Sequence, residues 1–163
     1  EQNPEEKTNG INKTITQTVE YTVNAENDSK KGIRTIKTYK NGVLIKFPHL
    51  GGVVIKENAE IGANCQIAKG ALSNTIIGKG TKINAGCYIA HNVVIGENVW
   101  ISPHVKITGS AKIKNNVTIF TASVIREQRT IGEGATIGMG AVVTKNVPAG
   151  ETWVGNPARK LEK

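Results

Sequence analysis

The stretch from Ile77 to Val143, IGKGTKINAGCYIAHNVVIGENVWISPHVKITGSAKIKNNVTIFTASVIREQRTIGEGATIGMGAVV, places an aliphatic residue at every sixth position without a break. A period of six fits neither the helical period of about 3.6 residues nor the simple alternation of a flat strand, but it does fit a short strand followed by a turn. Each hexad is therefore predicted to form one face of a parallel β-helix, an all-β fold. The aliphatic positions are Ile77, Ile83, Ile89, Ile95, Ile101, Ile107, Ile113, Ile119, Ile125, Ile131, Ile137 and Val143.

A second column follows four residues after each aliphatic position. Its members are small or branched, which suits a tighter inward position, and only Arg129 departs from this rule. The column holds Thr81, Cys87, Val93, Val99, Val105, Ala111, Val117, Ser123, Ala135 and Ala141.

Composition agrees with a solenoid. The 163 residues include only two Phe, two Trp and three Tyr, so the core must come from Ile, Val and Ala, while 18 glycines supply turns. Two cysteines without metal-ligand spacing around them are predicted to be reduced core residues, and no metal is expected. One repeat domain is expected for a chain of this length.

Charge and hydropathy exclude several functions. The net charge is +8, but no Lys/Arg run is interleaved with aromatic residues, which argues against a nucleic-acid partner and leaves an anionic phosphate ligand open. No apolar stretch of about 18 residues and no signal-peptide core is present. These absences predict a soluble protein with no membrane span.

Residues 1–48 form a separate N-terminal extension by sequence character. Alternating Thr and apolar residues from Thr14 to Val23 indicate a strand with one sheltered face. Two later runs, IRTIKTYK and VLIKF, are joined by Asn41-Gly42, a strong hairpin signal. We expect a β-hairpin extension that covers the open end of the β-helix.

The hexads IGENVW, IGEGAT and IGMGAV resemble those of the hexapeptide-repeat acyltransferases. The resemblance runs from about Phe47 to Leu161 and implies a left-handed β-helix domain over 49–157, with a C-terminal tail at 158–163. Three hexads then make one coil, so residues 18 apart stack. The run ALSNT inserts four residues before Ile77, and with that shift Cys65 and Cys87 occupy equivalent inward positions.

The candidate site lies in INAGCYIAHNVVIGENVW. His91 is the third residue of its hexad, a turn position that points outward, so it is not a core histidine in this architecture. A neutral imidazole can accept a proton from an amine or hydroxyl. One coil further, Gly109 would leave space above the imidazole and present a backbone N–H that could hold an oxyanion. An incidental surface histidine is the alternative.

The run from Phe47 to Ile101 is similar to the catalytic domain of the UDP-3-O-(3-hydroxyacyl)glucosamine N-acyltransferases, including the GAL insertion. That resemblance implies His91 as the general base and Gly109 as the oxyanion contact. Asn84 stands where those enzymes have an aspartate seven residues before the histidine, and an amide can orient an imidazole but cannot stabilise its charge. Pro103, His104 and Phe120 replace small residues beside the acyl groove, and Gln128 replaces a histidine. A short acyl group is therefore expected.

The closing segment IGMGAVVTKNVPAGETWVGNPARKL is similar to that of acetyl-CoA-dependent sugar acetyltransferases of the sialic-acid and bacillosamine pathways. The resemblance implies acetyl-CoA as acyl donor. It implies contacts to the cofactor by Gly140, Ala141, Lys145, Arg159 and Lys160. A solvated chain end is the alternative for the last two. The carrier-docking helices of the lipid A enzymes are not expected.

Trp100 stands where the bacillosamine enzymes have a histidine nine residues after the base. It is expected to stack on pantetheine or adenine, or else to pack between subunits. A homotrimer is expected, because the resembling enzymes complete their cleft with the next subunit and because Trp100, Val124 and Val142 would otherwise face water.

We predict an acetyl-CoA-dependent transferase that acetylates an amine or hydroxyl of a nucleotide-linked sugar in the bacterial cytoplasm. Lipid A type N-acylation from acyl carrier protein is the first alternative, and a non-catalytic β-helix trimerisation module is the second. A γ-type carbonic anhydrase is disfavoured because His49, His91 and His104 contain no closely spaced ligand pair.

Overall fold

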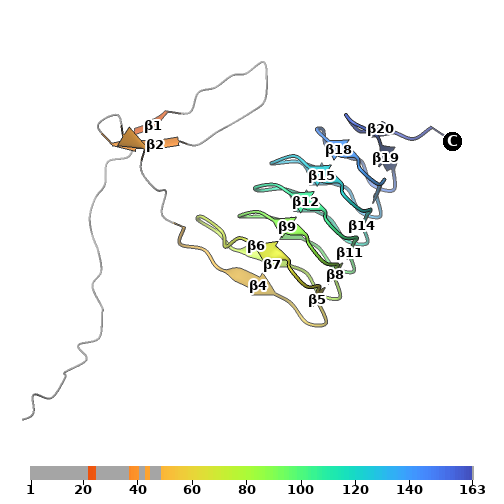
Figure 1. Cartoon of the computed structure of the whole chain (residues 1–163), viewed down its shortest axis with the longest axis horizontal. Coiled ribbons are helices and arrows are strands. Elements are labelled where there is room, and N and C mark those ends of the chain that lie inside the picture. The colour runs from red at the N-terminus through yellow and green to blue at the C-terminus, as the bar shows by residue number, and fades with distance from the viewer. Residues whose placement is uncertain (1–21, 25–36, 41–42, 45–48, 163) are drawn as a thin grey trace, which may run out of the picture. The chain divides into compact units, whose positions relative to one another are not determined.

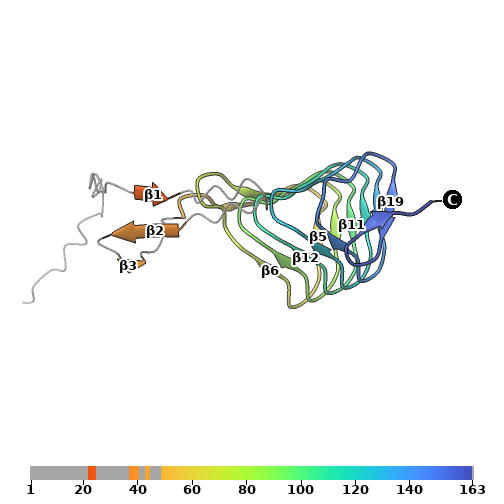
Figure 2. The same ribbon diagram turned by 90° about the horizontal axis from the view of Figure 1, so that it is seen from above.

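A computed structural model describes residues 22–24, 37–40, 43–44 and 49–162. The chain divides into two units, Glu1–Phe47 and Pro48–Lys163, and each is described by itself. All regular elements in the described residues are strands, and the second unit is the predicted parallel β-helix (Figures 1 and 2).

Three parallel sheets form the three faces of the β-helix. We name each face after its strand in the second coil. The β7 face contains β4 (Val53–Ile55), β7 (Thr75–Ile77), β10 (Val94–Ile95), β13 (Lys112–Ile113) and β16 (Thr130–Ile131). The β8 face contains β5 (Glu60–Ile61), β8 (Lys82–Ile83), β11 (Trp100–Ile101), β14 (Thr118–Ile119), β17 (Thr136–Ile137), β19 (Thr152–Val154) and β20 (Arg159–Lys160). The β9 face contains β6 (Gln66–Ile67), β9 (Tyr88–Ile89), β12 (Lys106–Ile107), β15 (Val124–Ile125) and β18 (Val142–Val143).

Strand pairing confirms the predicted spacing. Ile77 pairs with Ile95, and Ile95 with Ile113, each 18 residues on. The first coil is offset by 22 residues instead, since Ile55 pairs with Ile77. The four extra residues of the insertion are therefore accommodated without breaking the ladder.

Both inward columns are buried as predicted. The aliphatic residues from Ile77 to Val143 expose 2% or less of their surface, and so do the small or branched residues four positions later. Cys87 is buried and Cys65 half-buried, both as free thiols, and burial raises the pKa of Cys87. The core is a dry stack that aligns every coil with the next.

Each turn that follows a core aliphatic residue from Ile77 to Ile137 contains one residue in the left-handed backbone region, three positions after that aliphatic residue. Its φ lies between 52° and 70° throughout, a region that glycine and asparagine tolerate best. The residues are Gly80, Gly86, Asn92, Asn98, His104, Ser110, Asn116, Ala122, Gln128, Gly134 and Gly140. Glycine and asparagine accordingly occupy seven of these eleven positions.

The two ends of the β-helix differ. Ile55 and Ile61 in the first coil are 50% and 37% exposed, whereas Trp153 and Ala158 are buried at the other end. There β20 pairs antiparallel with β19, so Arg159 and Lys160, expected in a tail, are part of a strand. The C-terminal end of the core is closed by this hairpin.

The N-terminal unit shows the expected antiparallel pairing. β1 (Thr22–Asn24) pairs with β2 (Lys37–Lys40), and β2 pairs with β3 (Val43–Leu44). Lys40 opposes Val43, as a two-residue connection requires, while Asn41 and Gly42 lie outside the described residues. The proposed role of residues 1–48 as a cover for the first coil stays a prediction.

Ala122 offers a test of the turn geometry, because it is an exposed alanine with a φ of 60°. Ala122→Asn should raise the midpoint of thermal unfolding by about 1–3 °C, since asparagine tolerates this backbone region better. Differential scanning calorimetry measures the shift. Ala63→Asn, at an exposed turn position without a positive φ, is the matched control, and an equal gain there would contradict the explanation.

Candidate functional site

His91 begins a column of turn residues that follows the β9 face. The pairing of β9 with β12 and of β12 with β15 stacks His91, Gly109 and Glu127 on successive coils. Lys145 lies in the following turn, after β18, where the coil is two residues shorter because Val147 pairs with Ile131. Backbone hydrogen bonds support this alignment, since Ser110 N donates to His91 O and Gln128 N to Gly109 O, both at 3.0 Å. We call His91, Gly109 and Glu127 the His91 column.

The imidazole of His91 packs directly against Gly109. A Cβ at position 109 would lie 2.7 Å from Cε1 and 2.9 Å from Nε2 of the ring, so any side chain there would collide with it. The space expected above the imidazole is therefore filled by the ring itself. His91 is exposed, as its turn position predicts.

Asn92 determines which ring nitrogen of His91 carries the proton. Its Oδ1 lies 3.1 Å from Nδ1 of His91 and accepts the N–H of Ala71 at 3.0 Å. Its Nδ2 donates to the carbonyl and the hydroxyl oxygen of Ser73, both at 2.8 Å. This pattern orients the amide, so Nδ1 is the donor and Nε2, on the side of Gly109, keeps its lone pair.

Residues of the insertion before Ile77 fix the side chain and backbone of Asn92 by hydrogen bonds. Ala71 and Ser73 belong to it, and Thr75 continues the contact by accepting the backbone N–H of Asn92 at 2.9 Å. The hydroxyl of Thr75 in turn donates to Ala68 O at 2.7 Å. The insertion, which the sequence shows only as an interruption of the six-residue period, thus positions Asn92 and through it His91, the candidate base.

His49 is a second imidazole at the site. Its ring centroid lies 5.9 Å from that of His91, with the planes at 76°, an edge-to-face arrangement. The adjoining backbone is held by the insertion, since Leu50 N and Gly51 N both donate to Ala71 O. Sequence reasoning missed Asn92 and His49 here, because no spacing rule brings residues 49, 71 and 91 together.

Asn84 lies elsewhere in the same chain. It follows β8, whereas His91 follows β9, so the β9 face separates them. Its Oδ1 accepts the N–H of Ala85 at 2.7 Å. Within one chain, Asn92 and not Asn84 contacts the imidazole of His91, so the orienting role expected of Asn84 would require a second copy.

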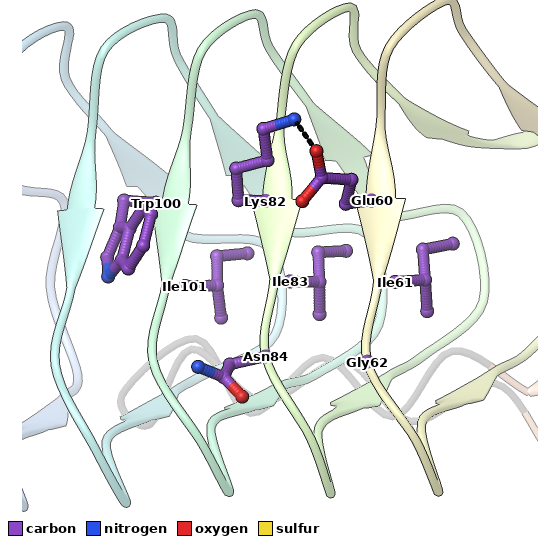
Figure 3. A pocket seen from close by; sticks show the side chains of 8 residues that line it. All are labelled: Glu60, Ile61, Gly62, Lys82, Ile83, Asn84, Trp100 and Ile101. Atoms are coloured by element: carbon purple, nitrogen blue, oxygen red, sulfur yellow. Dashed lines mark hydrogen bonds and ion pairs between the residues drawn. The ribbon is translucent and has the colours of Figure 1, made fainter.

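Asn84 and Trp100 border a pocket of about 530 Å³ on the β8 face (Figure 3). The Lys82 ammonium and the Glu60 carboxylate form an ion pair on one side, and the Trp100 side chain, 51% exposed, stands beside them. Backbone of β5, β8 and β11 forms the floor. An aromatic face next to paired charges and an amide suits a polar ring-shaped ligand.

The residues expected to contact the cofactor are dispersed. Lys145 is exposed in the turn after β18, and Gly140 is an exposed turn residue. The side chain of Ala141 is fully buried in the core, which leaves no side-chain surface for a ligand.

The two C-terminal cations already have partners. Nη1 of Arg159 donates to Ala158 O at 2.8 Å. Lys160 pairs with Glu151 at 3.0 Å, a contact that raises the pKa of Lys160. The pKa of Glu151 is lowered by its hydrogen bonds from Trp153 and Lys160.

The described part of the chain shows neither a metal-binding cluster nor a membrane-spanning helix. No three His, Cys, Asp or Glu side chains among them lie close enough together to hold a metal ion. No helix in that part of the chain is long and apolar enough to cross a membrane.

Comparisons with known proteins identify the same six-residue repeat. The family model of the bacterial transferase hexapeptide (six repeats) matches residues 74–109. UDP-3-O-acylglucosamine N-acyltransferase 2 of Nitrobacter winogradskyi is 57% identical over 122 residues, which cover 75% of this chain and 36% of that relative. The chain spans between 16% and 36% of the length of the curated relatives that it matches first.

Two solved structures share the fold at appreciable identity. The acetyltransferase domain of PglB from Neisseria gonorrhoeae, in complex with acetyl-CoA, is 30% identical with a TM-score of 0.58, over 71% of this chain and 58% of that one. WeeI from Acinetobacter baumannii is 38% identical with a TM-score of 0.53, over 82% and 61%. Together with the repeat and its ladder, these matches show that the β-helix of this chain is similar to the hexapeptide-repeat acyltransferases of bacteria.

Proposed function

We propose that the chain transfers an acetyl group from acetyl-CoA to an amine or hydroxyl of a nucleotide-linked sugar. The observation that carries the proposal is the Asn92–His91–Gly109 arrangement, in which Asn92 holds Nδ1 of His91 and the imidazole packs against the backbone of Gly109. Within the described residues the N–H of Gly109 makes no backbone hydrogen bond, while its carbonyl accepts Gln128 N. A base and an oxyanion donor are the two groups that acyl transfer requires.

The proton and the acyl group then move as follows. Nε2 of His91 removes a proton from the acceptor amine or hydroxyl as that atom attacks the thioester carbonyl. The Gly109 N–H donates to the oxyanion of the tetrahedral intermediate. When the C–S bond breaks, the imidazolium returns the proton to the leaving thiolate, and the base is neutral again. Asn92 accepts a hydrogen bond from Nδ1 throughout and keeps the ring in one tautomer.

The comparisons support the donor and the acceptor class separately. The PglB domain was solved with acetyl-CoA, which supports a CoA thioester as donor. The Nitrobacter relative carries a name that specifies a UDP-linked glucosamine as acceptor, which supports a nucleotide-linked sugar. Both relatives are bacterial, consistent with the expected bacterial cytoplasmic setting.

Lipid A type N-acylation from acyl carrier protein is the second candidate. It is favoured by the 57% identity to a relative named UDP-3-O-acylglucosamine N-acyltransferase 2. Against it stand Phe120, which is 42% exposed, and Pro103 and His104, at the corner between the β8 and β9 faces. The His104 ring lies over Gly86, where a Cβ would be 2.5 Å from Nδ1. These bulky groups favour a short acyl chain. A non-catalytic β-helix that serves as a trimerisation module is the third candidate function.

A donor assay tests the function. The chain should turn over acetyl-CoA with an amino or hydroxyl nucleotide sugar at a kcat/KM at least a hundredfold above that with 3-hydroxymyristoyl carrier protein. His91→Ala should lower kcat by about 10²–10⁴-fold, because the proton acceptor is lost. Turnover with the long-chain carrier protein alone would overturn the donor assignment. Equal turnover by wild type and His91→Ala would overturn the site.

Asn92→Gly tests the tautomer. Glycine accommodates the φ of 59° but removes the acceptor for Nδ1, so kcat should fall about 10–100-fold. Nitrogen NMR of His91 should show a mixture of tautomers in place of one. Asn116→Gly, at the same turn position with a φ of 58°, is the matched control. A single unchanged tautomer in Asn92→Gly would contradict the role of Asn92.

We also propose a homotrimer. Within one chain, Asn84 and Trp100 lie across the β9 face from His91, and Tyr88, Trp100 and Phe120 are exposed. Burial of such apolar groups stabilises association by about 25 cal/mol per Å². Light scattering at micromolar concentration should give three times the chain mass of 17.4 kDa. A monomeric mass would refute the assembly.

A further inference from the structure

The two cysteines of the chain lie opposite each other on the first two coils. β6 pairs with β9 in a register that places Gln66 against Tyr88, so Cys65 and Cys87, one residue earlier, face each other across the ladder. The hydrogen bond from Gln66 N to Cys87 O at 2.9 Å fixes this alignment. Adjacent parallel strands lie about 4.8 Å apart, which is within the range of about 4.4–6.8 Å that separates the Cα atoms of disulfide-bonded cysteines.

Both thiols contact the same short stretch of backbone. Sγ of Cys65 donates to Asn84 O at 3.1 Å, and Sγ of Cys87 lies 3.9 Å from Ala85 O, the next carbonyl along the chain. Cys87 also donates to Ser102 O at 3.3 Å. Burial raises the pKa of the Cys87 thiol, and the hydrogen bond and charge of Cys65 add to this effect. The two side chains are therefore close enough to interact while both are reduced.

The two thiols differ in their access to solvent. Cys87 exposes 1% of its surface, whereas Cys65 is half-buried in the first coil, where Ile55 and Ile61 are 50% and 37% exposed. A small oxidant that enters at this open end of the core therefore reaches Cys65 first. Loose packing also lets the first coil move by the roughly 1 Å that the two Cβ atoms must close to form a bridge.

We propose that Cys65 and Cys87 form a reversible disulfide that fastens the first coil to the second when the protein meets hydrogen peroxide. The sulfur of Cys65 attacks one peroxide oxygen, the O–O bond breaks, and a sulfenic acid and one water result. The sulfur of Cys87 then attacks the Cys65 sulfur, the S–O bond breaks, and the hydroxyl leaves as a second water with the proton of the Cys87 thiol. The two sulfurs have then given two electrons to one peroxide. A thiol reductant restores both thiols by exchange.

The bridge would stabilise the part of the β-helix that has the fewest neighbours. β4, β5 and β6 end their sheets among the described strands, so the first coil is paired on one side only (Figure 1). The segment 66–86 that the bridge closes includes Ala71 and Ser73, whose hydrogen bonds fix Asn92 beside His91. A cross-link at this point limits local opening of the first coil and of the insertion together. This inference does not depend on the proposed acyl transfer.

Thiol titration in denaturant, before and after treatment with hydrogen peroxide, tests the bridge. The oxidised chain should show no free thiol, a mass lower by two hydrogens and a cross-linked pair of peptides that contain Cys65 and Cys87, and dithiothreitol should restore both thiols. Amide hydrogen exchange at Gly62 and Gln66, which donate to carbonyls of the second coil, should be about tenfold slower in the oxidised form. The amide of Trp100, in a central coil, should exchange at the same rate in both forms.

Cys65→Ser and Cys87→Ser are the matched control variants. Serine fits this inward column, since Ser123 occupies the equivalent position and donates its hydroxyl to Gly138 O at 2.8 Å. Either variant should therefore fold, and peroxide should leave the exchange of its first coil unchanged. The proposal fails if peroxide leaves both wild-type thiols titratable, if Cys65 is oxidised to a sulfinic acid while Cys87 stays free, or if bridges form only between chains. A bridge that forms without slowing exchange in the first coil would refute the stabilising role.

Discussion

The in-register stacking of one coil on the next is the constraint on which the rest of the structure depends. Each strand is only two or three residues long in the β-helix and would be unstable alone, but the strands of the central coils pair with strands 18 residues before and after them. The aliphatic column keeps this register because a slip would move an isoleucine from the core to water. Turn residues at equal positions are therefore held about 4.8 Å apart, coil after coil.

This stacking converts a one-dimensional spacing into the column of turn residues that we propose as the site. His91 meets Gly109 because they are one coil apart, and the missing Cβ lets the ring pack against the backbone. The same geometry places Glu127 one coil beyond Gly109. In a solenoid of this kind, an extended ligand can contact turn residues of several successive coils. Residues of one coil can then catalyse a reaction while residues of another coil bind the ligand.

The proposed site lies at departures from the repeat. The insertion before Ile77 supplies Ala71 and Ser73, which orient Asn92 and through it the imidazole of His91. Arg129 gives up a core position and places a guanidinium beside Glu127. A regular hexad would pack better in both places. Departures of this kind are expected at ligand-binding sites.

The sequence by itself determined the solenoid, its period, its inward columns, the offset of the first coil and the outward position of His91. These follow from local periodicity, because a buried column requires the same residue type at every repeat. Only the tertiary structure decided that Asn92 orients His91, that His49 packs against it, that Asn84 and Trp100 lie on another face, and that Ala141 is buried. Those contacts depend on an irregular loop and on which corner each turn occupies, and no spacing in the sequence specifies how a loop folds back onto a neighbouring coil.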